Sequence, residues 1–445
     1  MTDAIWIKDP LAILADGAER GVVVVDGRIV ELVGKGAQPK TQAAPFEAGA
    51  HVVIPGLINT HHHFYQTLTR AVPAALDREL FPWLKALYPI WARMTPEVLE
   101  LAVTVAMAEL MLSGCTTTTD HHYVFPRGLE HGIDIEVAAA KRLGLRVLLT
   151  RGSMNLSERD GGLPPDSVVQ DEDAILADSE RVVARYHERG EAAMTQIALA
   201  PCSPFSVTTS LMLATATLAE KLDVRLHTHL AETEDENRFC EQLYKCRPLD
   251  YLEDCGWLNG RTWLAHGIHF SAGEMPRLAK AGVSISHCAC SNQTLASGCC
   301  PVCELEAAGV AIGLGVDGSA SNDESNLMQE VRAAFLLQRA RYGVGKVSHK
   351  DALRWATKGS AACVGRPELG EIAVGKRADL AFYKLDELRF SGHGDPVAAL
   401  VLCGAHRADR VMVNGRWTVE NGAIPGLDLA DLMRRHQAAA RMVQG

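Results

Sequence analysis

The chain has 445 residues and 47% of them are hydrophobic, so it can bury one large core, or one core with a smaller satellite domain. Its formal net charge of −10 and the lack of a Lys/Arg-rich run argue against nucleic acid polymers as substrates. The first residues, MTDAIWIKDP, lack the features of a secretory signal, and no apolar run approaches membrane-spanning length. A cytoplasmic protein without a membrane partner is therefore expected.

Both ends of the chain have the pattern of short β-strands. GVVVVDGRIVELVG lies near the start, and EIAVGKRADLAFYKL and RVMVNGRWTVENG lie near the end, with β-branched runs broken by Asp-Gly or Asn-Gly turns. These segments predict one small β-sandwich domain built from both chain ends. Residues 1–55 form its N-terminal part, and residues 366–445 form its C-terminal part and a terminal helix.

The middle of the chain, residues 56–365, alternates short apolar runs with amphipathic helical stretches, which is typical of β/α units around a parallel sheet. Eight units of this kind predict an α/β fold of the TIM type, a (β/α)8 barrel with insertions. The candidate strands are residues 51–61, 115–122, 146–152, 195–201, 224–229, 262–266, 283–287 and 311–317.

The way these strands end indicates a site. Six of the eight finish on His or Asp, namely His61 to His63, Asp120, His229, His266, His287 and Asp317. In a barrel the carboxyl ends of all strands meet on one face, where the active site is built. Polar residues far apart in sequence are therefore expected to meet in space.

Two histidines at the end of the first strand suggest a pair of ligands for one metal ion. His61 and His63 lie two residues apart, so the alternation of a strand puts both imidazoles on one side, with His62 on the other. An H-x-H pair by itself is a weak signal, because histidines also serve as ordinary hydrogen-bonding residues. The third nitrogen ligand is His229 or His227, and closeness to the strand end and to Glu232 favours His229.

Asp317 ends the eighth strand in GLGVDGSASND, where Gly and Ser residues let the backbone turn sharply. Beside a metal it can be a fourth ligand and accept a proton from water. The alternative is a residue that only stabilises the turn. An Asp that closes the last strand of a barrel whose first strand carries H-x-H favours the ligand.

Several segments together resemble the amidohydrolase superfamily over nearly the whole chain: PGLINTHHHFYQ, HLAET, LAHGIH, and SHCACSN with GLGVDG. The resemblance implies a distorted barrel and a homo-oligomer. It also implies one divalent metal ion per chain, Zn²⁺ in preference to Fe²⁺, held by His61, His63, His229 and Asp317. The fourth strand lacks the lysine that bridges two metals in binuclear members, which favours a single ion.

Within the superfamily, HHHFYQTLTRAVP, TTTTDHHYVFP and CSNQTLASGCCPVCE are similar to the branch of purine and pyrimidine deaminases and s-triazine hydrolases. This branch implies hydrolytic deamination of a purine-type heterocycle, with 8-oxoguanine as the expected small-molecule substrate. The alternatives are a hydroxyatrazine-type aminohydrolase, an isoguanine or cytosine deaminase, a binuclear amidase, and a catalytically inactive binding protein.

The same resemblance suggests roles around the metal. Asp317 and His266 orient the attacking hydroxide, and Glu232 shuttles a proton. Gln66 resembles the glutamine that binds a purine edge, although a surface helix start is an equal alternative. Cys202 occupies a slot where guanine deaminases carry an arginine, which disfavours guanine. Trp83 covers the ring plane or belongs to the core.

Twelve cysteines are expected to be free thiols in a large chain without an export signal. A crowded set raises the alternative of a structural zinc. Its spacing does not repeat C-x-x-C pairs, so small packing residues near a site are the favoured interpretation. The set comprises Cys288, Cys290, Cys299, Cys300 and Cys303.

Overall fold

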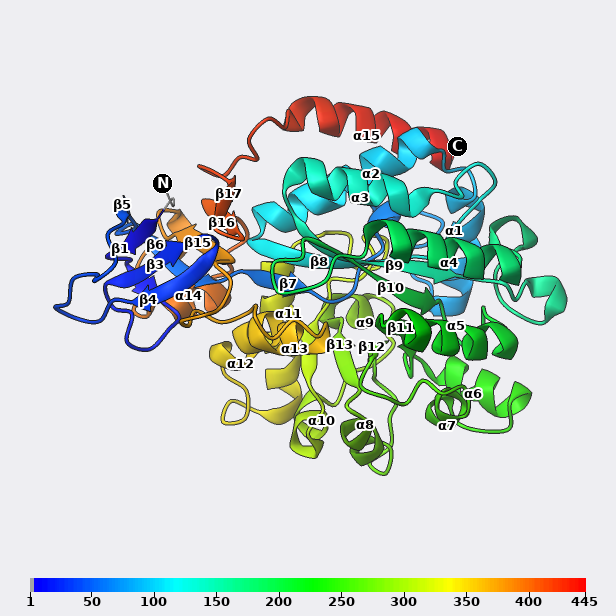
Figure 1. Ribbon diagram of the computed structural model, residues 1–445. Helices are drawn as coiled ribbons and strands as arrows, with labels where there is room; N and C mark the ends of the chain where they lie inside the picture. Colours follow the sequence, from blue (N-terminus) through cyan, green and yellow to red (C-terminus); the bar gives the residue numbers. More distant parts are fainter. Residues whose placement is uncertain (1–3) are drawn as a thin grey trace.

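A closed barrel of eight parallel strands forms the centre of the computed structural model, which describes residues 4–445 (Figure 1). Residues 1–3 of the expected N-terminal segment lie outside the described residues. Every predicted strand is present, so the predicted barrel is confirmed. Around the barrel the strands are β7 (Leu57–Asn59), β8 (Cys115–His122), β9 (Arg146–Ser153), β10 (Thr195–Pro201), β11 (Leu226–Leu230), β12 (Thr262–His266), β13 (Ser284–His287) and β14 (Ile312–Leu314).

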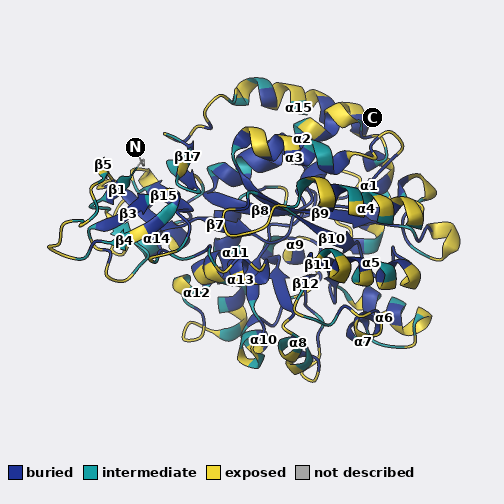
Figure 2. Cartoon of the chain, in the orientation of Figure 1, coloured by how far each residue is buried: buried dark blue, intermediate teal, exposed yellow. Residues whose placement is uncertain are grey.

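Helices cover the outside of the barrel, so that its strands are buried on both faces, as parallel sheets require (Figure 2). The longest of them begin at capping residues; Thr95, for example, accepts a hydrogen bond from the Val98 N–H at the start of α2. The helices around the barrel are α2 (Pro96–Leu112), α3 (Gly132–Leu143), α4 (Glu172–Tyr186), α5 (Thr209–Leu222), α6 (Glu234–Leu243), α7 (Pro248–Asp254), α8 (Met275–Ala281), α9 (Ala289–Thr294), α10 (Val302–Ala308), α11 (Leu327–Tyr342), α12 (His349–Arg354), η4 (Trp355–Gly359) and α13 (Ser360–Cys363).

Insertions after the strands build the mouth of the barrel. The short helix η1 (Phe64–Thr69) and the helix α1 (Leu80–Trp91) follow β7. The turns η2 (Glu158–Asp160) and η3 (Asp166–Val168) follow β9. The helix α1 places the apolar side chains of Leu80, Trp83 and Leu84 beside the predicted site residues.

Two antiparallel-rich sheets from the two chain ends form a β-sandwich beside the barrel (Figure 1). Ile7 and Val22 of one sheet share a buried core with Val53, Leu380 and Phe382 of the other. One sheet has the order β4 (Arg28–Leu32), β3 (Gly21–Val25), β1 (Ile5–Lys8), β5 (Ala44–Glu47). The other has the order β17 (Arg416–Val419), β16 (Arg410–Val413), β15 (Leu380–Lys384), β6 (His51–Pro55), β2 (Ala12–Ile13).

The first predicted strand, residues 51–61, is divided between the two domains. Its first half is β6 in the sandwich, and its second half is β7 in the barrel. Gly56 makes the change of direction possible, because a Cβ there would lie 2.3 Å from the Thr116 side chain. The prediction of extended strand structure for residues 51–61 is therefore confirmed. The passage of the chain from one sheet to the other depends on this close packing at Gly56.

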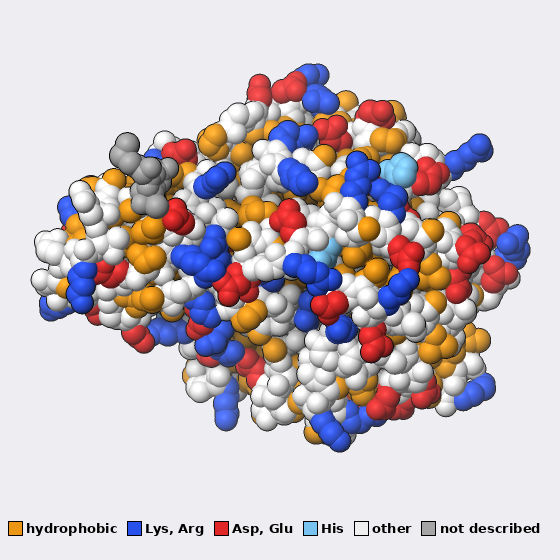
Figure 3. Space-filling view, in the orientation of Figure 1, with side chains coloured by type: hydrophobic (Ala, Val, Ile, Leu, Met, Phe, Trp, Pro, Cys, Tyr) orange, Lys and Arg blue, Asp and Glu red, His pale blue; other side chains and the backbone are white. Residues whose placement is uncertain are grey.

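The chain ends on the helix α15 (Leu429–Gln444), which lies across α2 and η1 of the barrel (Figure 1). Two further elements, η5 (Leu388–Phe390) and α14 (Pro396–Leu402), join β15 to β16. On the face shown in Figure 3, basic and acidic side chains are interspersed. Within residues 4–445, no helix combines the length and apolar character needed to cross a membrane.

Candidate metal centre and active site

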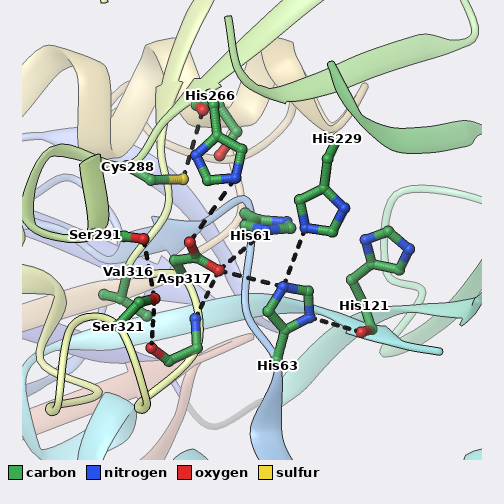
Figure 4. Close-up of polar contacts among 12 residues, drawn as sticks. His61, His63, His121, His229, His266, Cys288, Ser291, Val316, Asp317 and Ser321 are labelled. Atoms are coloured by element: carbon green, nitrogen blue, oxygen red, sulfur yellow. Dashed lines mark hydrogen bonds and ion pairs between the residues drawn. The ribbon is translucent and has the colours of Figure 1, made fainter. Parts of the chain in front are cut away.

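The four predicted metal ligands converge at the mouth of the barrel (Figure 4). The Asp317 Oδ1 atom lies 3.3 Å from His61 Nε2 and 3.2 Å from His63 Nε2. The His63 Nε2 atom in turn lies 3.2 Å from His229 Nε2. Four donors contributed by β7, β11 and β14 and the residues that follow them therefore surround one point.

A chain of hydrogen bonds fixes the tautomer of His61. The Nδ1 atom of His227 lies 2.8 Å from the Trp263 carbonyl oxygen, which can only accept, so His227 carries its proton on Nδ1. The Nε2 atom of His227 then accepts from His61 Nδ1 at 2.8 Å. This leaves a lone pair on His61 Nε2, which has no hydrogen-bond partner in the described part of the chain.

His63 and His229 are fixed in the same way by carbonyl groups. The Nδ1 atom of His63 donates to the His121 carbonyl at 2.8 Å, and the Nδ1 atom of His229 donates to the Cys202 carbonyl at 2.7 Å. Their Nε2 atoms consequently face each other as lone pairs, which repel unless a cation lies between them. Burial also lowers the pKa of His229 to about 3, and neutral imidazoles are what a metal requires. The donor set fits a divalent metal ion.

Asp317 holds its position through an unusual backbone conformation. Its φ angle is 63°, and its Oδ1 atom accepts a hydrogen bond from the Gly318 N–H at 2.7 Å. Its Oδ1 atom thus faces the Nε2 lone pairs of His61 and His63, an arrangement of acceptor atoms that a bound cation stabilises.

Glu232 and His266 stand on the far side of Asp317. The His266 Nε2 atom lies 3.5 Å from Glu232 Oε2 and 3.9 Å from Asp317 Oδ2, and its Nδ1 atom lies 2.9 Å from Asn292 Oδ1. Burial, together with the charge of Asp317, raises the pKa of Glu232 well above its usual value. A carboxyl group that binds its proton more tightly than usual is suited to a role in proton transfer.

The predicted substrate residues Gln66, Trp83 and Cys202 line one cavity with the metal donors. Apolar side chains such as Leu84 and Phe205 form much of its wall beside the polar groups of the centre, as in small-molecule sites. Its lining is His63, Gln66, Leu80, Trp83, Leu84, Tyr123, Cys202, Phe205, His229, Glu232, His266, Leu295, Asp317 and Ser321.

Gln66 is buried, and its Oε1 atom has no hydrogen-bond partner within residues 4–445. A Cβ at Gly318 would lie 1.8 Å from that oxygen, so the glycine makes room for the amide. Trp83 is also buried, and its Nε1–H donates to the Ala320 carbonyl at 3.1 Å, which ties α1 to the loop after β14. Burial raises the pKa of the Cys202 thiol to about 12, so the thiol is neutral.

Three residues near the centre were not predicted. His121 stacks on His229 with ring centroids 4.8 Å apart, and strand alternation along DHH could have revealed that it faces the barrel interior. Tyr123 lines the cavity from just beyond β8. Glu236 accepts hydrogen bonds from the Ala231 and Glu232 N–H groups at 2.9 and 3.0 Å, which holds the turn that carries Glu232.

The remaining predicted features lie outside the centre. His62 points away from it, with Nε2 at 2.9 Å from Ser325 Oγ. All twelve cysteines, which lie within residues 4–445, are free thiols. Across that same range, none of the five clustered cysteines belongs to a group of donors close enough to hold a metal.

Comparison with known proteins yields one family and a consistent set of relatives. The amidohydrolase family matches residues 52–418. The chain is 62% identical over 439 residues to 8-oxoguanine deaminase of Pseudomonas aeruginosa, covering 98% of each chain. It is 37% identical over 447 residues to hydroxydechloroatrazine ethylaminohydrolase of Pseudomonas sp., covering 95% of this chain and 91% of the relative. The structure of atrazine chlorohydrolase from Arthrobacter aurescens, complexed with zinc, superposes with a TM-score of 0.92 at 33% identity, covering 98% and 100% of the two chains.

Proposed function

The chain belongs to the amidohydrolase family, and from this premise we propose that it hydrolyses 8-oxoguanine to uric acid and ammonia. The observation that carries this proposal is the contact of His61 and His63 Nε2 with one Asp317 oxygen and of His63 Nε2 with His229 Nε2, beside a cavity with apolar and polar walls. The high identity to a deaminase of that substrate over nearly the whole length supports the choice of reaction.

We propose one Zn²⁺ at this centre, held by His61, His63, His229 and Asp317. When bound, it would acidify a water molecule, whose pKa falls from about 16 to ~7, and so supply a nucleophile at neutral pH. Asp317 accepts the proton of that water with its outer oxygen. His266, held by Asn292, hydrogen-bonds the same water and aims it at the ring carbon.

Glu232 carries out the proton transfers on the substrate. Its raised pKa keeps a proton available, which it gives to the ring nitrogen beside C2, so that C2 becomes electrophilic. After water has added, Glu232 takes the remaining hydroxyl proton of the adduct and delivers it to the exocyclic nitrogen, which leaves as ammonia, and Asp317 returns the proton that it accepted to Glu232. A carbonyl remains at C2, and the product is uric acid.

Selection of the oxidised purine is assigned to the other cavity residues. Oxidation at C8 turns N7 from an acceptor into an N–H donor and adds a carbonyl at C8. The small, neutral thiol of Cys202 leaves room for that edge and presents no opposing donor, whereas an arginine there would suit an N7 acceptor. The unpaired amide of Gln66 binds a polar edge of the ring, and Trp83 covers its plane.

The wider setting is proposed on the same basis. The many free thiols suit a reducing compartment, so we place the enzyme in the cytoplasm. We propose a homo-oligomer only on the resemblance to the family. Within residues 4–445, we propose that residues 4–55 form the first part of the sandwich, residues 56–365 the barrel, and residues 366–445 the second part of the sandwich with the terminal helix α15. The partner is a small heterocycle and not a nucleic acid polymer.

The deciding experiment is a substrate panel with kcat/KM measured for 8-oxoguanine, guanine, isoguanine, cytosine and hydroxyatrazine. We expect 8-oxoguanine to exceed guanine by as much as ~10⁴-fold, because guanine leaves buried polar groups unpaired. A guanine value equal to that of 8-oxoguanine would overturn the assignment. A dominant hydroxyatrazine value would favour the second candidate, which the 37% identical relative supports.

A further inference from the structure

A second group of metal-binding side chains lies outside the barrel wall, between β8 and α3. His121 points into the barrel, so its neighbours Asp120 and His122 point outward, where they meet Glu136 of α3. All three side chains are fully buried. One imidazole and two carboxylates, with donor atoms within 4.8 Å of one another, are thus enclosed where water does not reach them.

The contacts inside this group leave several donor atoms without an aligned hydrogen bond. His122 Nδ1 lies 2.9 Å from Glu136 Oε1 in a close ionic contact, yet neither atom has a hydrogen-bond partner among residues 4–445. Two ligands of one ion can approach each other in this way. The catalytic centre shows the same arrangement, where His61 Nε2 lies 3.3 Å from Asp317 Oδ1 and likewise has no hydrogen-bond partner among those residues.

The two buried carboxyl groups, when ionised, would also be stabilised by a bound cation. Asp120 uses one oxygen to accept from the Phe64 N–H at 2.7 Å, while its Oδ2 atom and both Glu136 oxygens have no hydrogen-bond partner within the described chain. Arg151 is paired with His122 across the neighbouring strand, but Asp178 already engages its guanidinium at 2.8 Å. Two buried carboxylates without a countercharge are costly.

We propose that Asp120, His122 and Glu136 bind a second divalent transition-metal ion, such as Zn²⁺, with a structural role. Imidazole and carboxylate donors suit this class of ion. The ion would neutralise the carboxylates and join α3 to β8. Through the hydrogen bond that the Phe64 N–H donates to Asp120, it would also brace the segment that carries His63 and Gln66.

The alternative occupant of this group is a proton. Burial raises the pKa of Glu136 to about 8, so without an ion this carboxyl stays protonated at neutral pH and can share its proton with Asp120. This alternative predicts no bound metal between β8 and α3, and metal analysis separates the two.

The first test is crystallographic and needs no variant. Protein loaded with Zn²⁺ and dialysed against metal-free buffer is crystallised, and anomalous differences are collected at the zinc edge. We expect two peaks per chain, one in the barrel and one bonded to Asp120, His122 and Glu136 at ~2.0–2.2 Å. A single peak in the barrel overturns the proposal, as does a second peak beside His266, which would mean a binuclear catalytic centre.

The second test isolates the site in solution. His229→Ala removes a ligand of the catalytic centre, so the metal that this variant retains reports the second site. We expect about one Zn²⁺ per chain in His229→Ala, with a melting temperature that rises on the order of 3 °C with saturating Zn²⁺. Adding Glu136→Gln to that variant should abolish both. Equal zinc content in the single and double variants would contradict the proposal.

The matched control is Glu330→Gln, since Glu330 is equally buried and its pKa is also raised to about 8 by burial. It accepts hydrogen bonds from Cys290 and Asn322 and belongs to no metal-binding group of the described residues. We expect this variant to keep both ions. Deamination by Glu136→Gln reports separately on the proposed function, because this variant keeps the catalytic donors.

Discussion

His227 and His229 lie two residues apart on β11 and have opposite tasks. His229 offers Nε2 to the centre, whereas His227 uses both nitrogens to connect Trp263 with His61. We expect His229→Ala to lose one ion per chain and all activity. His227→Ala should keep its ion at saturating metal with an affinity ~10–100-fold lower, as is typical when an outer-shell partner is removed. Elemental analysis and chelator competition measure both, and the reverse result would exchange the two roles.

Glu232 and Glu234 form a second matched pair. Glu232 is buried beside His266, whereas Glu234 is exposed at the start of α6. We expect Glu232→Gln to retain the catalytic ion while kcat falls by ~10²–10⁴-fold, the usual contribution of a proton-transfer residue. Glu234→Gln should keep nearly full activity. Steady-state kinetics with metal analysis decides, and a Glu232→Gln protein that has lost the catalytic ion would make Glu232 a ligand.

At the scale of elements, the C-terminal helix supports the substrate site from outside. Gln444 of α15 donates to the Leu68 carbonyl at 2.6 Å, and His436 Nε2 lies 3.1 Å from Thr67 Oγ1. Both contacts hold η1, which carries Gln66. The helix farthest along the chain thus braces a cavity built by the first barrel strand.

The double variant His436→Ala/Gln444→Ala tests this support. Loss of two hydrogen bonds, at ~1 kcal/mol each, should loosen η1 and raise KM by about tenfold, with a smaller effect on kcat. Arg434→Ala, on the exposed face of the same helix, is the control and should leave KM unchanged. If kcat falls while KM stays constant, η1 does not act through substrate binding.

At the scale of the whole molecule, one buried ion pair joins the barrel to the sandwich. Arg146 of β9 donates to both carboxylate oxygens of Asp379 at 3.1 and 3.2 Å, and Asp379 also accepts from the Asn414 N–H at 2.7 Å. The side chains of Arg146 and Asp379 are 0% and 2% exposed, so neither can turn to water if the other is lost.

We expect Asp379→Asn to lower the free energy of unfolding by ~3–5 kcal/mol, because it leaves a guanidinium buried without its counterion. The exposed pair Arg142–Glu100, with both side chains 49% exposed, provides the control. Glu100→Gln should change the free energy of unfolding by less than ~1 kcal/mol. Denaturant unfolding monitored by fluorescence measures the free energy of unfolding of both variants. Equal losses in the two variants would show that burial does not determine the contribution of the Arg146–Asp379 pair.

The sequence alone determined the barrel and the chemistry of its mouth. Strand alternation placed His61 and His63 on one face, and the convergence of barrel strands brought them toward His229 and Asp317. Both rules depend only on local backbone geometry and on the order of the elements. The first rule acts through chain neighbours and the second through the order of the strands, so a sequence pattern can show both.

Only the tertiary structure decided which atom of each residue faces which partner. The preference for His229 over His227 rests on a carbonyl of Trp263 and on His61, which lies 166 positions away from His227. The space for Gln66 depends on the missing side chain of Gly318. Glu136 meets His122 because α3 packs against β8. Each of these facts depends on distances between residues remote in sequence, and such distances exist only once the core has packed.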